Sequence, residues 1–386
     1  MPADAISLRA RQIHFSSIVI DAHADTPQRF LFDHFDMGRL DAEGCVDIPR
    51  LRAGGVGTIF FALWVPVEIT GAAAVARAFD LLDGVEEQIG RHRDALTLAT
   101  SAREIRTARE QNKIAILLGV EGGHAIDNDL QVLRRFAERG VRYMTLTHDA
   151  ATDWADSSNA ASRHNGLTDF GREVVREMNR LGVLVDVSHV SDQTFRDVID
   201  ASCAPVIASH SCCRAICGAP RNLSDELILA LAARGGVFHI TFHVAFLSEQ
   251  YANAAKAMAE ESAARKTAAK LKFGANEARK LIEGQRSSDE LIRAGKLPQV
   301  RGEKIIEHID HAVRLAGADH VGLGSDFDGA FMPEGMDDAR HFPKITEGLL
   351  DLGYDEADIA KILGGNTLRA MAESARIAGE LRSQKP

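Results

Sequence analysis

The stretch SIVIDAHAD, residues 17–25, joins a short apolar run to a histidine and an aspartate two positions apart. The β-branched residues at 18–20 are typical of a buried strand. Side chains two apart in an extended chain point the same way, so His23 and Asp25 leave the strand end on one side. An imidazole and a carboxylate in this arrangement can bind one divalent metal ion. The tripeptide alone is weak evidence, so its meaning depends on what the rest of the chain supplies.

Seven further apolar runs follow, and helical patterns separate most of them. Residues 72–90 and 168–181, for example, carry apolar side chains at steps of three and four. This alternation predicts an α/β fold, a (β/α)8 TIM barrel. The other predicted strands are 55–66, 113–123, 141–148, 183–189, 204–210, 236–242 and 320–329.

The repeat breaks once, after the seventh predicted strand. From about residue 249 to 299 the chain is rich in Ala, Lys and Glu and contains no strand pattern. We expect a helical insert there, which is a candidate lid or oligomer contact. Helices at the C-terminus complete a single barrel domain over residues 1–386, at 342–352, 356–363 and 366–375.

Acid–base and metal-binding side chains follow six of the eight predicted strands. In barrels of this class the chemistry lies at the carboxyl ends of the strands. Three histidines and two carboxylates among them suffice for two Zn²⁺ ions, and Co²⁺ or Mn²⁺ would also suit these ligands. The seven residues are His23, Asp25, Glu121, His148, His189, His210 and Asp326.

Strand order predicts the division of labour among these residues. Glu121 is expected to bridge the two ions, because its strand lies between that of His23 and those of His189 and His210. Two neighbouring ions can activate a shared water and polarise a carbonyl. Asp326 would then move the proton from water to a leaving amine. His148 would stabilise the oxyanion.

Composition narrows the range of partners. The chain of 386 residues has a formal net charge of −10, which argues against nucleic acid as a partner. No run of about 20 apolar residues predicts a membrane span. Since no leader or anchor is recognisable, we expect a cytoplasmic protein, or a periplasmic one if a leader was removed. Five cysteines, four of them within residues 203–217, do not suggest a disulfide framework.

Several motifs together resemble one family, the membrane (renal) dipeptidases, which are M19 metallopeptidases of the amidohydrolase superfamily. The resemblance implies the same five metal ligands, with Glu121 as the bridge. It adds Arg221 as the residue that grips the terminal carboxylate of the substrate. The motifs are DAHAD (21–25), GVEGGH (119–124), RYMTLTH (142–148), WAD (154–156), GLTDFG (166–171), DVSH (186–189), SHS (209–211), RN (221–222), GSDFDG (324–329) and GGN (364–366).

The sequence therefore predicts a dinuclear zinc dipeptidase that hydrolyses short L-Xaa-L/D-Xaa dipeptides through a metal-bridging hydroxide. Its expected partners are a small dipeptide and a second copy of the chain in a homodimer. One alternative keeps the metal site but acts on an N-acyl amino acid, a lactone or a β-lactam. Another is a metal-stabilised scaffold without activity, with the insert as its interface.

Overall fold

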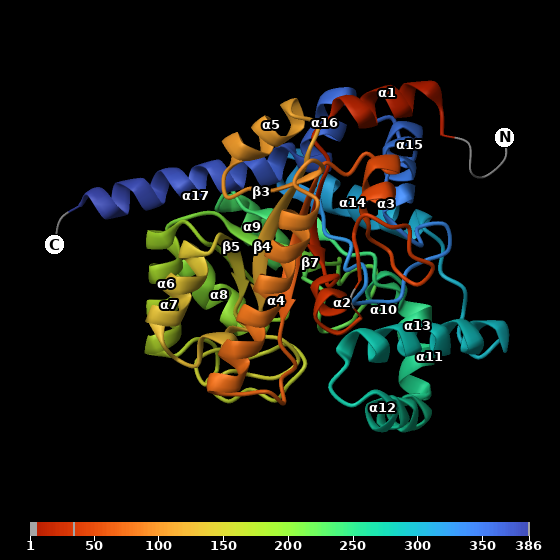
Figure 1. Ribbon diagram of the computed structural model, residues 1–386, viewed down its shortest axis with the longest axis horizontal. Coiled ribbons are helices and arrows are strands. Elements are labelled where there is room, and N and C mark those ends of the chain that lie inside the picture. The colour runs from red at the N-terminus through yellow and green to blue at the C-terminus, as the bar shows by residue number, and fades with distance from the viewer. Residues whose placement is uncertain (1–5, 34, 385–386) are drawn as a thin grey trace.

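A barrel of eight parallel strands is the framework of the computed structural model, which describes residues 6–33 and 35–384. The strands follow the order β1-β2-β4-β5-β6-β7-β8-β9, and a parallel bridge between Ala24 and Phe327 brings the two ends of the sheet together. With helices between the strands (Figure 1), this nearly closed barrel confirms the predicted fold. The strands are β1 (Ile20–Ala24), β2 (Thr58–Trp64), β4 (Ile114–Glu121), β5 (Val141–Thr145), β6 (Leu184–Asp186), β7 (Val206–Ser211), β8 (Val237–Ile240) and β9 (Val321–Leu323).

A further strand, β3 (Leu96–Leu98), pairs with β4 outside the barrel path. The sequence did not reveal it. Strands typically run to about five or six residues, and three residues are too few to show an alternating pattern.

Local capping decides where the covering helices begin and end. In α7 (Asp169–Leu181) the Thr168 side chain accepts a hydrogen bond from the Gly171 amide, and Gly182 ends the helix at φ 74°. The other helices around the barrel are α1 (Leu8–Ser16), α2 (Pro27–Phe32), α3 (Ile48–Ala53), α4 (Ala72–Arg91), α5 (Ala102–Glu110), α6 (Leu130–Glu138), α8 (Asp192–Ala201), α9 (Asp225–Ala233), α14 (Glu303–Ala316), α15 (Pro343–Asp351), α16 (Glu356–Ala360) and α17 (Asn366–Ser383). Short helical turns are η1 (Gly123–Ile126), η2 (Ala318–His320), η3 (Ala339–His341) and η4 (Lys361–Gly365).

The centre of the barrel is filled where β4 and β5 meet. All eight residues of β4 are buried, as expected for a parallel strand covered on both faces. Gly119 pairs with Tyr143, and a Cβ atom at Gly119 would lie 2.1 Å from Cζ of that tyrosine. Only a residue without a side chain therefore leaves room for the ring. The Tyr143 hydroxyl reaches Nδ1 of His23 at 2.9 Å, which connects the core to the strand ends.

The expected insert is helical and follows β8, the seventh strand of the barrel. Arg279 pairs with Asp33 at 3.0 Å and with Glu43 at 2.8 Å, both in the segment after β1. Gln285 donates to the Ala330 carbonyl, beyond β9, at 3.0 Å. The insert is thus attached to loops at the carboxyl ends of two strands (Figure 1). Its helices are α10 (Val244–Leu247), α11 (Glu249–Ala257), α12 (Ala259–Phe273) and α13 (Glu277–Arg293). The division into a single domain stays a prediction.

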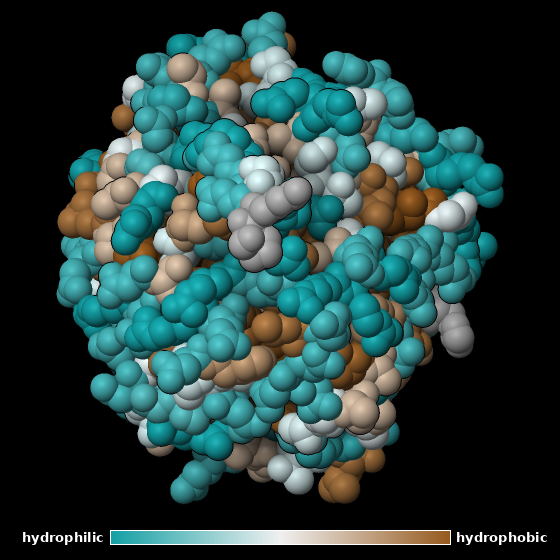
Figure 2. Space-filling view, turned by 90° about the vertical axis from the view of Figure 1, so that its left-hand side faces the viewer, coloured by the Kyte–Doolittle hydropathy of each residue, from teal (hydrophilic) through white to brown (hydrophobic). Residues whose placement is uncertain are grey.

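All five cysteines are free. Four of them are buried, whereas Cys203 is exposed in the turn between α8 and β7. Elsewhere on the surface, hydrophobic side chains are scattered among hydrophilic ones on the face that Figure 2 shows.

Candidate metal centre

The residues predicted for the site all lie at or just beyond the carboxyl ends of barrel strands. His189 and Asp326 each stand three residues past a strand, because positive φ angles of 67° and 66° turn the chain there. The predicted strands 183–189 and 320–329 therefore end earlier than expected. Such angles are uncommon outside glycine and are concentrated at functional sites. The remaining positions are His23 in β1, Asp25 just after it, Glu121 at the end of β4, His148 after β5, and His210 in β7, with Arg221 in the loop beyond.

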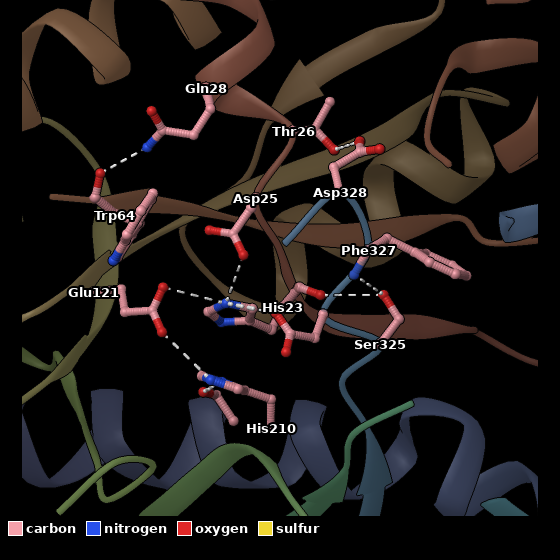
Figure 3. A network of polar contacts seen from close by, with 12 residues as sticks. His23, Asp25, Thr26, Gln28, Trp64, Glu121, His210, Ser325, Phe327 and Asp328 are labelled. Atoms are coloured by element: carbon pink, nitrogen blue, oxygen red, sulfur yellow. Dashed lines mark hydrogen bonds and ion pairs between the residues drawn. The ribbon is translucent and has the colours of Figure 1, made fainter. Parts of the chain in front are cut away.

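Glu121 stands at the centre of the cluster. Its Oε1 lies 3.1 Å from Nε2 of His189 and 3.4 Å from Nε2 of His210. Its Oε2 lies 3.5 Å from Nε2 of His23, so the two carboxylate oxygens face different histidines (Figure 3). This is the arrangement that a carboxylate bridging two metal ions requires.

A second set of ligand atoms surrounds His23. Its Nε2 is 3.7 Å from an oxygen of Asp25 and 3.9 Å from Oδ1 of Asp326. Ligand atoms of three such groups lie within 4.8 Å of one another: His23 with Glu121 and His210, Glu121 with His148 and His189, and His23 with Asp25 and Asp326. The groups share members, so together they describe one extended site.

Buried atoms without partners indicate that these residues suit divalent ions. Nε2 of His23 and Oδ1 of Asp25 are buried and make no hydrogen bond. Nε2 of His189 and Nε2 of His210 lie only 3.0 Å apart and face the same oxygen. An unsatisfied buried polar atom is costly, and converging imidazole nitrogens with carboxylate oxygens match the ligands of zinc.

Outer hydrogen bonds hold two of the three histidine rings in the orientation that a metal ligand needs. Nδ1 of His23 contacts the Tyr143 hydroxyl. Nδ1 of His210 contacts Oγ of Ser209 at 2.8 Å, and that hydroxyl donates to Asp186 at 2.6 Å. These bonds leave Nε2 free to face the site. Sequence reasoning missed the three partners, although Tyr143, Asp186 and Ser209 all stand in quoted motifs.

Two buried carboxylates near His23, those of Glu121 and Asp326, have pKa values shifted in opposite directions. Burial opposes the charged form of Glu121, but His23, His189 and His210 hold its pKa well below the ordinary value. Burial raises the pKa of Asp326 well above its ordinary value. Asp25 and Glu121 add to that rise, against the opposing effect of His23. Glu121 is therefore suited to stay charged and Asp326 to carry a proton.

A cavity of about 1110 Å³ opens above these residues. Its floor includes Glu121, His148 and Asp326, and its wall comes largely from α11, α12 and α13. Arg221 is only 2% exposed; its guanidinium donates to Oγ of Ser211 at 2.6 Å and to the His210 carbonyl at 2.7 Å. Arg221 does not belong to the described residues that line the cavity.

A parallel barrel with histidines and carboxylates converging on one glutamate defines a class of proteins that bind divalent metal ions at the strand ends. Within that class, the chain belongs to the membrane dipeptidase family, peptidase family M19, which matches residues 7–385. The resemblance noted in the sequence is thereby confirmed, and with it membership of a family of metal-dependent peptidases.

Several named proteins that are similar to this chain are dipeptidases or metallopeptidases. Human Dipeptidase 3 is 31% identical over 389 residues, which cover 98% of this chain and 69% of the human protein. The chain spans about two thirds of the length of the curated relatives that it matches. The crystal structure of the probable dipeptidase PvdM from Pseudomonas aeruginosa is 25% identical with a TM-score of 0.81, covering 96% of this chain and 98% of that one. A metallo peptidase from Rhodobacter sphaeroides, bound to a phosphinate mimic of L-Ala-D-Ala, is 25% identical with a TM-score of 0.74, covering 93% and 99%.

The family corrects the prediction about cellular location. Membership of the membrane dipeptidase family, with Dipeptidase 3 as a relative, contradicts a cytoplasmic protein, so that prediction is wrong. It depended on the lack of a recognisable leader or anchor signal, which does not follow from the physics of the barrel. In the described part of the chain, no helix combines the length and apolarity needed to cross a membrane.

Proposed function

We propose that this protein is a dipeptidase that uses two zinc ions to hydrolyse short L-Xaa-L/D-Xaa dipeptides. The observation that carries the proposal is the central carboxylate of Glu121, whose two oxygens face separate sets of histidines. The relative from Rhodobacter sphaeroides, whose bound ligand mimics a dipeptide, supports the choice of substrate class.

Five residues would hold the ions. His23 and Asp25 would bind one ion, His189 and His210 the other, and Glu121 would bridge them. When bound, the two ions would make water a stronger acid and polarise the peptide carbonyl.

Asp326 and His148 would act on the reacting atoms. Asp326 lines the cavity, where a carboxylate can take a proton from water and deliver it to the leaving amine. The Nε2 atom of His148 lies 4.0 Å from Oε1 of Glu121 on the cavity floor. An N–H group there can donate to the carbonyl oxygen as negative charge develops on it.

Arg221 would hold the terminal carboxylate of the dipeptide. Its guanidinium has five N–H donors, and the two bonds to Ser211 and His210 leave others for a ligand. The Nε atom is buried and has no hydrogen-bond partner. Because Arg221 lies next to His210 along these bonds, a carboxylate held there would lie close to the metal ligands.

Removal and restoration of metal tests the proposal. Protein treated with a chelator and then dialysed should lose hydrolysis of a dipeptide panel, and about two equivalents of Zn²⁺ should restore it. Hydrolysis of N-acyl amino acids and lactones is measured in parallel. Faster hydrolysis of these compounds than of dipeptides would favour the alternative substrate class. Hydrolysis that survives complete metal removal, measured by metal analysis, would overturn the proposal.

A further inference from the structure

One cavity-lining carboxylate has no role in the proposed chemistry. Asp149 directly follows His148 in the loop after β5. Its Oδ2 lies 3.9 Å from Nδ1 of His148, and its Oδ1 lies 3.9 Å from Nδ1 of His189. A single carboxylate thus stands at equal distance from the outer nitrogens of two site histidines.

The third metal-facing histidine lacks the support that the other two have. His23 and His210 have close partners at Nδ1, from Tyr143 at 2.9 Å and Ser209 at 2.8 Å. Nδ1 of His189 is buried and has no hydrogen-bond partner. The Asp149 carboxylate, 3.9 Å from this atom, is placed to complete the pattern.

The orientation of the rings explains why one carboxylate stands beside both. Nε2 of His189 and Nε2 of His148 face Oε1 of Glu121, at 3.1 and 4.0 Å. The rings lie 4.4 Å apart and are tilted by 34°, so their Nδ1 atoms turn toward the same side. The Asn159 side chain donates to Oδ1 of Asp149 at 2.8 Å, which keeps the carboxylate beside the rings.

We propose that Asp149 is a positioning residue, which accepts the Nδ1–H group of His189 when metal is bound. The carboxylate is 58% exposed, so it is free to move the short distance that separates 3.9 Å from a hydrogen bond. An outer carboxylate fixes the tautomer of a histidine ligand and makes it a better donor. This inference rests on the proposed metal site.

Metal binding by the metal-free protein provides the test. Asp149→Ala should weaken the binding of at least one Co²⁺ ion about 10- to 100-fold in calorimetry and change the visible Co²⁺ spectrum. Asp149→Asn keeps an oxygen acceptor and should restore part of the affinity. Asp153→Ala is the matched control, because Asp153 lies in the same loop, 68% exposed and paired with Arg163 at 3.6 Å. The control should leave affinity and spectrum unchanged.

Each other result has a distinct meaning. Unchanged Co²⁺ affinity in Asp149→Ala would overturn the positioning role. A raised KM for dipeptides but not for N-acyl amino acids, with metal binding intact, would overturn it in favour of direct contact with a substrate ammonium group. If the unmodified protein fails to bind two ions, the proposed function fails before the variant is considered. Thermal unfolding of each metal-free variant checks that it is folded.

Discussion

At the scale of single residues, the surroundings of a carboxylate decide its role more than its type does. Glu121 and Asp326 are both buried and both face His23, yet their pKa values move in opposite directions. Three histidines surround Glu121, whereas Asp326 stands near two other carboxylates. Separated pKa values of this kind commonly distinguish a group that stays charged from one that transfers a proton.

Replacement of Asp326 by Asn should separate catalysis from metal binding. The amide has nearly the same shape but cannot accept and return a proton, so we expect kcat to fall about 10²- to 10⁴-fold. Metal analysis should still find two ions per chain, since five other residues are the proposed ligands. Loss of the ions along with the activity would instead make Asp326 a ligand.

Arg221→Lys tests recognition of the substrate carboxylate. Lysine keeps the charge but loses the planar fork, so KM for a dipeptide should rise about 10- to 100-fold, the cost of one charge-assisted hydrogen bond. A dipeptide with a C-terminal amide serves as the matched substrate. The unmodified protein should prefer the acid, and the variant should lose most of that preference. An equal loss on both substrates would contradict this role.

At the scale of elements, the pairing of β4 with β5 connects the barrel core to the metal site. Gly119 leaves space for the Tyr143 ring, and that ring reaches His23. A change in the middle of a strand can therefore reach a proposed metal ligand without touching it. No contact of this kind is visible in a motif, because it depends on strand register.

Gly119→Ala should disturb the core and the site together. The added methyl group meets a buried ring, so the free energy of unfolding should fall by about 1–3 kcal/mol, as for other overpacked cores. Metal affinity should fall as well, since Tyr143 would be pushed away from His23. Gly90→Ala in α4 is the control: its Cβ would meet nothing within 4 Å, and a helical alanine should be neutral or stabilising. Equal unfolding curves for both variants would contradict the expected clash.

The barrel, and the meeting of the candidate site residues at its strand ends, could be predicted from sequence, for a physical reason. Buried parallel strands are continuous apolar runs, and candidate ligands such as His23 and His189 stand where those runs end. The outer partners could not be predicted. Tyr143 reads as one more core residue, and its contact with His23 depends on register and on the missing side chain at Gly119.

At the scale of the whole molecule, buried neutral histidines that are not among the proposed metal ligands couple stability to pH. His14, His239 and His308 have pKa values lowered to about 4, chiefly by burial. His14 connects α1 to the rest of the chain through Thr346 at 2.8 Å and the Gly54 carbonyl at 2.8 Å. The predicted homodimer stays a prediction, which sedimentation equilibrium would test.

Acid should destabilise the metal-free protein between pH 6.5 and pH 4. The unfolded chain binds protons at these histidines near pH 6.5, whereas the folded chain does so only near pH 4. Stability is therefore complete above pH 6.5 and falls as pH falls, by up to about 3 kcal/mol per histidine. Urea unfolding at pH 7, 6 and 5 measures the slope, and His14→Asn should reduce it. An identical slope in the variant would contradict the assignment.

The cysteines provide a practical handle on this molecule. Burial raises the pKa of the thiols of Cys45, Cys212, Cys213 and Cys217, which slows their reaction with maleimides. Cys203 is exposed and precedes the amino end of β7, opposite the end that carries His210. A fluorophore or spin label should thus attach selectively at one position without mutagenesis. Its signal would report tumbling, assembly or surface attachment while the catalytic mouth stays untouched.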